Sequence, residues 1–278
     1  MILRSPAVNL ITPVNWQHPL NRGLVAWWLV MPGNNAGSKL VDITKYGNDG
    51  TLTNMNTATA WKGANRLGSY GALDFDGSND YVNLGSDVET NISQFSLSAW
   101  VRWTRGGTQA PEEVVVSRWA DSEANKMYLW RWDSATSSME FFTNTSGDDV
   151  LTSSDVDLSD LDWHLINATF DGSTMRQYID GVVSTSTTAT TGATNSNATV
   201  VTAGLDTRDA TTELDGFLGL ISDIRIYNCA LSESEILHLY QDSLLGYPHT
   251  LNYIRRPLVA AAGVTSDWYY RQQQAVIA

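Results

Sequence analysis

The chain has 278 residues, of which 42% are hydrophobic, enough to bury one large core or two small ones. It carries 17 Lys and Arg against 30 Asp and Glu, a formal charge of -13 that repels phosphate and argues against a nucleic-acid partner. The single Cys229 excludes an internal disulfide, and four histidines leave no Cys/His cluster of zinc-ligand spacing.

Residues 1–22 are predicted to form an N-terminal arm. Their short apolar stretch is broken by Pro6 and Pro13, so it lacks the long apolar core of a secretory signal. No apolar run in the chain approaches the length of a membrane span. We therefore expect neither a signal peptide nor a membrane-spanning segment.

Residues 23–243 show a period-two alternation of apolar and polar residues, which predicts an all-β domain. In "FSLSAWVRW", for example, Phe95, Leu97 and Ala99 fall on one face and Ser96 and Ser98 on the other. The main predicted strands are 23–30, 95–103, 112–119, 126–132, 138–144, 162–170 and 216–228.

Turn residues separate several of these strands. "ALDFDGSNDYVNLG", residues 72–85, reads as a hairpin whose tip holds Asp76, Asn79 and Asp80. These oxygen-bearing side chains are either ligands or turn formers. Further on, two Asp-Gly turns flank residues 174–179 and predict three adjacent antiparallel strands. The polar tract 183–199 is either a long loop or a flat edge strand.

The last strand and the segment after it have distinct signatures. Strict alternation over residues 218–227 puts Ile224 and Ile226 on one face, and Ile221, Asp223 and Arg225 on the other. A capping box, formed by Ser232 and Glu235, then predicts a short helix over 232–242, with Leu231 and Ile236 at the staple positions. Residues 244–278 lose both periodicities and carry Arg255, Arg256 and Arg271 against Asp267, which predicts a basic C-terminal arm.

Seven segments, in this order, resemble laminin-G-like domains of the concanavalin A-like lectin/glucanase superfamily: "GLVAWW", "YGNDGTL", "ALDFDGSNDYVNLG", "FSLSAWVRW", "DWHLINATFDG", "YIDG" and "GLISDIRIYNCALSESEILHLY". The resemblance implies an all-β, two-sheet antiparallel jelly-roll β-sandwich over residues 23–243 with one short C-terminal helix. It also implies a concave face and loops able to bind glycans, often beside a structural Ca²⁺. In these families the "FDG.ND" stretch is mainly a hairpin, so we interpret Asp76 and Asp80 as turn formers.

A calcium site, if the resemblance extends to it, is expected where the loop "VDITKYGNDGTL" meets the last long strand, since Ca²⁺ needs oxygens from separate segments. The candidate metal ligands are Asp42, Asn48 and Asp223. In the alternative, Asp42 and Asn48 satisfy turn backbone, and Asp223 pairs with Arg225 or a loop amide.

Catalytic carboxylates are not expected. The glucanases of this superfamily carry two or three carboxylates alternating along one strand, and no strand of this chain has that pattern. Glu112 and Glu113 are adjacent and face opposite sides, Asp215 has no third carboxylate at the right spacing, and His164 is interpreted as packing within a strand. We therefore expect the protein not to be an enzyme.

Aromatic residues are the feature that favours sugar binding, because the chain has 11 Trp. Tyr128, Trp130 and Trp132 share one strand face and are the candidate glycan-stacking residues. This stripe either fills the space between the sheets or lines the concave surface.

The two ends of the chain look like those of laminin-G-like proteins encoded by tailed phages. This resemblance implies a non-enzymatic virion surface or decoration protein, on a capsid or fibre, whose sandwich also holds cell-surface glycans. The arms, residues 1–22 and 244–278, would dock it to other virion proteins or to copies of itself as a homo-oligomer. The alternatives are a free calcium-dependent carbohydrate-binding module and, third, a glycoside hydrolase with an unusual site.

Overall fold

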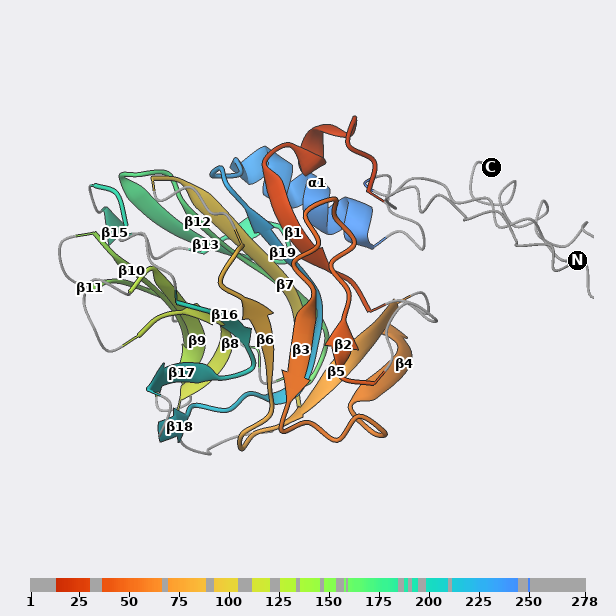
Figure 1. Cartoon of the computed structure of the whole chain (residues 1–278). Helices are drawn as coiled ribbons and strands as arrows, with labels where there is room; N and C mark the ends of the chain where they lie inside the picture. The colour runs from red at the N-terminus through yellow and green to blue at the C-terminus, as the bar shows by residue number, and fades with distance from the viewer. Residues whose placement is uncertain are drawn as a thin grey trace, which may run out of the picture.

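A computed structural model describes residues 14–30, 37–66, 70–88, 93–104, 112–120, 126–133, 136–145, 148–153, 158, 160–184, 188–189, 192–194, 199–209, 212–244 and 250. Most of both predicted arms, residues 1–13 and 251–278, lies outside these residues. Figure 1 shows two curved sheets, with the helix and the start of the described chain packed on one of them.

Nine strands form the first sheet, in the order β14-β13-β12-β7-β19-β5-β4, with β1 also paired to β19 and β15 to β13. Their bounds are β1 Leu24–Trp28, β4 Trp61–Arg66, β5 Tyr70–Asp76, β7 Phe95–Trp103, β12 His164–Phe170, β13 Thr174–Ile179, β14 Val182–Val183, β15 Thr188–Ala189 and β19 Leu218–Tyr227. The predicted run of three antiparallel strands, β12 to β14, is confirmed.

Eight strands form the second sheet, in the order β11-β10-β9-β8-β16-β6-β3-β2, and β17 and β18 form a separate pair. Their bounds are β2 Lys39–Leu40, β3 Gly50–Thr53, β6 Tyr81–Gly85, β8 Glu112–Arg118, β9 Tyr128–Asp133, β10 Ser138–Asn144, β11 Asp148–Ser153, β16 Val201–Ala203, β17 Asp206–Asp209 and β18 Thr212–Leu214. All pairs within the two sheets are antiparallel. The predicted jelly-roll sandwich is confirmed.

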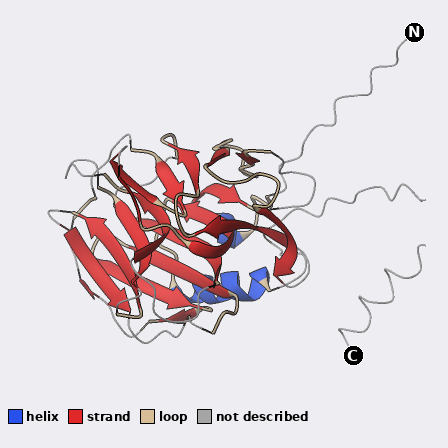
Figure 2. Ribbon diagram, turned by 90° about the horizontal axis from the view of Figure 1, so that it is seen from below, coloured by secondary structure: helices blue, strands red, loops and turns tan. Residues whose placement is uncertain are grey.

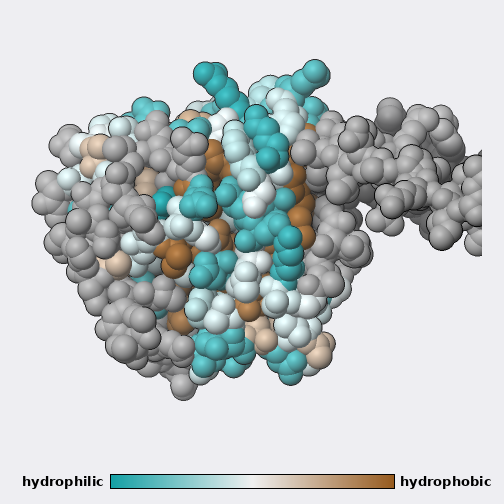
Figure 3. Space-filling view, viewed as in Figure 1, coloured by the Kyte–Doolittle hydropathy of each residue, from teal (hydrophilic) through white to brown (hydrophobic). Residues whose placement is uncertain are grey.

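The main core lies between the two sheets. From β7 it takes Phe95, Leu97 and Ala99, as the alternation predicted, and from β9 it takes Tyr128 and Trp130. Burying apolar surface contributes about 25 cal/mol per Å², so this layer stabilises the packing of the two sheets. In the view of Figure 3 the described surface is mainly hydrophilic, with smaller apolar patches.

A second core lies on the other face of the nine-stranded sheet. There α1 (Glu233–Ser243) and the short 3-10 helix η1 (Pro19–Asn21) lie against the strands (Figure 2). The predicted capping box of α1 is present, and both staple residues, Leu231 and Ile236, are buried. Trp100 of β7 packs on Tyr240 of the helix. Within the described ranges, no helix is long and apolar enough to cross a membrane.

Strand β19 departs from the predicted alternation. Its register to β7 shifts between Ser222 and Arg225, and Asp223 has a φ of 52°, so the strand contains a β-bulge. The extra residue reverses the phase, which places Ile221 on the inner face with Ile224 and not, as predicted, on the face of Arg225. The prediction was wrong because it assumed regular alternation along the whole strand, and the sequence pattern does not reveal the extra residue of a bulge.

The stretch 72–85 is a turn, but it is not a hairpin between paired strands. β5 and β6 belong to different sheets, so Asp76 to Asp80 carry the chain across the sandwich. The Asp76 carboxylate accepts the Ser78 N–H at 2.9 Å, and Asp80 accepts the Asp76 N–H at 3.2 Å. These contacts are those of turn formers.

His164 begins β12 between two carboxylates. Its Nδ1 lies 2.8 Å from Asp180 and its Nε2 lies 3.0 Å from Asp160. The hydrogen bond to Asp180 raises the pKa of His164 to about 9 against the opposite effect of burial, and Asp160 adds to the rise. The imidazolium therefore joins β12 to the Asp180-Gly181 turn of β13.

His164→Gln tests this ion cluster. Because the folded pKa lies above the ordinary value of 6.5, the stabilisation is complete below pH 6.5 and is lost as the pH rises through about 9. We expect the substitution to lower the free energy of unfolding by about 1–2 kcal/mol at pH 6, and by much less at pH 10, in urea titrations. His238→Gln, on the exposed side of α1, is the control. An equal loss for His164→Gln at both pH values would contradict the account.

Candidate functional site

The loop between β2 and β3, residues 41–49, is organised by one buried carboxylate. Asp42 is 5% exposed. Its Oδ1 accepts the N–H groups of Trp27 at 3.1 Å and Thr44 at 2.9 Å. Its Oδ2 accepts the Thr44 hydroxyl at 2.8 Å and the Asn48 N–H at 2.9 Å. Hydrogen bonds to an ionised acceptor are about twice as strong as neutral ones, so these four contacts fix the loop backbone.

Strand β1 holds the loop from the other side. The Asn48 side chain donates to the Val25 carbonyl at 3.2 Å, while the Asn48 carbonyl accepts Trp28 Nε1–H at 2.6 Å. The Ile43 N–H donates to the Trp27 carbonyl. The loop is therefore bonded to the nine-stranded sheet near both of its ends, through Asp42, Ile43 and Asn48.

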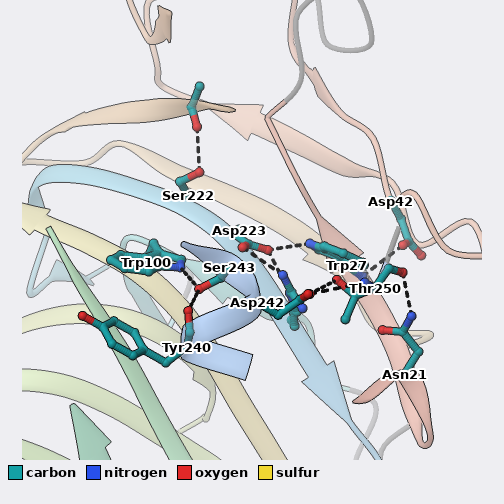
Figure 4. Close-up of polar contacts among 12 residues, drawn as sticks. Asn21, Trp27, Asp42, Trp100, Ser222, Asp223, Tyr240, Asp242, Ser243 and Thr250 are labelled. Carbon is teal, nitrogen blue, oxygen red and sulfur yellow. Dashed lines mark hydrogen bonds and ion pairs between the residues drawn. The ribbon is translucent and has the colours of Figure 1, made fainter. Parts of the chain in front are cut away.

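Asp223, at the bulge of β19, lies on the far side of Trp27 from Asp42 (Figure 4). Its carboxylate accepts both Nε–H and Nη2–H of Arg225, at 2.9 and 3.0 Å, and also the indole N–H of Trp27. The Arg225 guanidinium lies 3.8 Å from the centre of the Trp27 ring. Burial alone would lower the pKa of Arg225, but the charge of Asp223 raises it, so the guanidinium stays charged.

The predicted metal ligands therefore have protein partners. Asp42 and Asn48 satisfy turn backbone, and Asp223 pairs with Arg225, which are the contacts of the structural alternative. In the described part of the chain, no three His, Cys, Asp or Glu residues form a group that could hold a metal. The oxygens of Asp42 and Asp223 already accept N–H and O–H donors, so this arrangement does not fit Ca²⁺. Calcium binding by the protein stays a prediction, without these residues as its ligands.

The tip of the loop presents an aromatic pair with a cation. Tyr46 is 50% exposed, and its ring meets that of Trp16 edge to face, at 85° and with 6.1 Å between centroids. Lys45 Nζ lies 4.8 Å from the centre of the Trp16 ring and 5.2 Å from that of Tyr46. We call Trp16, Lys45 and Tyr46 the aromatic platform. Of the described large hydrophobic residues that are exposed, Tyr46 is the one aromatic.

Trp16 is positioned by its neighbours in the chain. Residues 14–22 belong to the predicted N-terminal arm, yet Val14 and Leu20 are buried in the second core on either side of Trp16. Asn21 Nδ2 donates to the carbonyl of Thr250 at 2.7 Å, and the Asn15 N–H donates to the same carbonyl at 2.9 Å. Asp242 of α1 in turn accepts the Thr250 hydroxyl at 2.8 Å. Figure 4 shows the contacts of Thr250 with Asn21 and Asp242, beside Trp27.

The predicted glycan-stacking stripe lies inside the sandwich. Tyr128, Trp130 and Trp132 are 0%, 1% and 9% exposed. Trp130 donates its indole N–H to Gln177 of the opposite sheet at 3.1 Å, and Trp132 packs on Trp103. Of the two alternatives, the stripe thus fills the space between the sheets. We correct the assignment accordingly, because rings buried between two sheets cannot stack on a sugar.

The aromatic platform was not predicted from the sequence, because the predicted stacking residues were chosen among aromatic residues in alternating strands. Tyr46 is the one aromatic residue of the polar turn "TKYGND", which has no apolar periodicity that would predict a buried ring. That isolation is the signal in the sequence that could have found it. Trp16 carries no such signal, since it lies about 30 positions away and meets Tyr46 only in the fold.

The two adjacent carboxylates considered for catalysis, Glu112 and Glu113, lie on β8 and have protein partners. Glu112 and Glu113 face opposite sides of β8, as predicted: Glu113 accepts the Leu218 N–H at 3.0 Å, whereas Glu112 pairs with Arg131 at 2.7 Å. The same Arg131 binds Glu140 of β10 at 2.9 Å. These two outer-face carboxylates therefore share one guanidinium.

The sequence profile of the concanavalin A-like lectin/glucanases superfamily matches residues 76–237, more than half of the chain. The matched span begins after the loop 41–49 and so does not include the aromatic platform. No curated protein sequence matches the chain.

Several solved structures share the fold. Domain 4 of an extracellular arabinanase from Geobacillus stearothermophilus, in complex with arabinotriose, has a TM-score of 0.56 and 21% identity, covering 78% of this chain and 98% of that domain. The botulinum neurotoxin serotype D ligand-binding domain, in complex with N-acetylneuraminic acid, has a TM-score of 0.56 and 14% identity, covering 82% of this chain and 55% of that one. A mutant Trypanosoma rangeli sialidase has a TM-score of 0.57 and 17% identity, covering 80% and 33%. This chain thus spans about half of the toxin domain and a third of the sialidase.

Asp42→Ala tests whether the carboxylate organises the loop. Four donors would lose their acceptor, so we expect the free energy of unfolding to fall by about 2–4 kcal/mol. Amide hydrogen exchange at Thr44 and Asn48 should accelerate more than exchange in β7. Asp87→Ala, which removes an exposed carboxylate, should change neither quantity. Unchanged exchange at Thr44 and Asn48 in Asp42→Ala would show that the loop conformation does not depend on the Asp42 carboxylate.

Proposed function

The chain belongs to the concanavalin A-like lectin/glucanases superfamily, and from this premise we propose that its sandwich binds glycans at the aromatic platform. The observation that carries the proposal is the half-exposed ring of Tyr46, held at a right angle to Trp16 beside the Lys45 ammonium. Two of the similar folds were solved with a carbohydrate, arabinotriose and N-acetylneuraminic acid.

The platform has the chemistry that sugar recognition needs. An aromatic ring offers a flat apolar face to the C–H groups of a sugar at a cost of only two side-chain torsions. The Lys45 ammonium supplies up to three donors for hydroxyl oxygens. Because Asp42 and strand β1 already fix the loop, little backbone entropy is lost when a ligand binds.

We propose that this binding is not accompanied by catalysis. Cleavage of a glycosidic bond needs two carboxylates on either side of it, one acting as an acid. The carboxylates of the loop are those of Asp42, which accepts four hydrogen bonds, and Asp49, which accepts the Asp42 N–H and pairs with Lys39. Their engagement in holding the loop supports a binding role.

We also propose that the sandwich is displayed on a virus particle. The resemblance of the chain ends to tailed-phage proteins is the ground for this proposal, and one structural observation supports it. The Asn15 N–H donates to the Thr250 carbonyl, so the two predicted arms continue from neighbouring points. A particle component that binds both arms at one place would orient the sandwich.

Tyr46→Ala should weaken glycan binding about tenfold or more, a loss of about 1.4 kcal/mol, because the exposed stacking face is removed. The test is a glycan array followed by calorimetry with the strongest ligand, in Ca²⁺ and in EDTA. Tyr81→Ala, which removes a half-buried tyrosine of β6, is the control. We expect equal affinity in both buffers. Loss of binding in EDTA would instead support the calcium-dependent alternative, and full binding by Tyr46→Ala would exclude the platform.

Display on a particle predicts a difference in protease sensitivity. Residues 1–13 and 251–278 have few core-forming periodicities, so we expect them to be cleaved in the isolated protein and protected on purified particles. Mass spectrometry of limited tryptic digests identifies the cuts. Equal cleavage in both states, or absence of the protein from the particles, would contradict display through the arms.

A further inference from the structure

We propose that the aromatic platform selects glycans that carry a carboxylate, an inference that rests on the proposed glycan-binding function and names its ligand class. The ground is the charge of Lys45, which has no acidic partner among the described residues although the chain has 30 Asp and Glu against 17 Lys and Arg.

Five other described cations are held in ion pairs, and Arg102 and Arg118 donate to backbone carbonyls. The six ion pairs join Lys39 to Asp49, Lys62 to Asp74, Arg131 to both Glu112 and Glu140, Arg176 to Asp171, and Arg225 to Asp223. Lys45 instead lies over two rings, at the exposed tip of the loop. A cation held over aromatic faces keeps its charge while its position is restricted. The Lys45 ammonium is therefore available to bind an anionic group carried by a sugar that stacks on the platform.

The acidic groups of the same loop do not neutralise this ammonium. The oxygens of Asp42 are buried and accept Trp27, Thr44 and Asn48 donors. Asp49 is paired with Lys39. The formal charge of -13 repels an acidic ligand at long range, but at physiological salt charges separated by more than about 8 Å are screened, so local contacts decide at the surface.

A second lysine over an aromatic ring provides an internal comparison. Lys126 Nζ lies 5.3 Å from the centre of the Trp119 ring, on the outer side of the eight-stranded sheet. Trp119 is only 4% exposed, so its face is closed to a sugar. Only the Lys45 arrangement, of these two, combines a cation with an open stacking face.

Two sources of the carboxylate are tested side by side. Calorimetry with the full chain compares 3′-sialyllactose with its methyl ester, and tri-galacturonate with its methyl ester, so that within each pair the carboxylate charge is removed and only methyl groups are added. The variants are Lys45→Gln, which replaces the ammonium by a neutral amide on a slightly shorter side chain, Lys45→Arg, which keeps the charge, and Lys126→Gln as the matched control.

We expect at least one acid to bind fivefold or more tighter than its ester, a preference that Lys45→Gln removes and that Lys45→Arg and Lys126→Gln retain. Whichever pair shows it identifies a sialic acid or a uronic acid as the ligand. Equal binding of acid and ester, or a preference that survives Lys45→Gln, would overturn the inference and leave glycan binding intact. No binding of either pair or of any neutral glycan on the array would overturn both proposals.

Discussion

The proposed site depends on the hydrogen bonds that the buried carboxylate of Asp42 accepts. Its two oxygens accept four donors, three from the loop 41–49 and one from Trp27 of β1. Trp27 in turn binds Asp223, whose charge is balanced by Arg225 in the middle of the nine-stranded sheet. Removing one partner of a buried charged pair costs several kcal/mol, so each member is held in place by the others. The loop thus takes its position from the sheet.

Much of the fold was predictable because local patterns and tertiary packing agree. The alternation in β7 and the capping box of α1 each involve a few neighbouring residues. In the fold, these side chains are buried or hydrogen-bonded as their order in the sequence predicts. The predictions were wrong where the position of a side chain or turn is set by how one strand pairs with another. The bulge at Asp223 reverses the faces of β19, and the turn at Asp76 crosses between sheets, which no spacing reveals.

The same distinction explains the site. Tyr128, Trp130 and Trp132 were correctly placed on one face of β9, but only the position of the opposite sheet shows that this face is the core. Asp42 and Asn48 were correctly assigned to one loop, and the fold supplies hydrogen-bond donors where the sequence suggested a cation. Trp16 and Tyr46 meet only because Val14 and Leu20 tie the start of the described chain to the second core. The proposed recognition loop thus lies outside the span that matches the family.

The most direct test of the proposed site is two-dimensional NMR of the 11 tryptophan indole N–H signals during titration with a glycan that binds on the array. Trp16 forms the platform with Tyr46, whereas Trp27, Trp100 and Trp130 are buried in the two cores. The account predicts that the Trp16 signal shifts first and most, with the core signals nearly unchanged. A largest shift at Trp119, behind the eight-stranded sheet, would place the ligand on the other side of the molecule and contradict it.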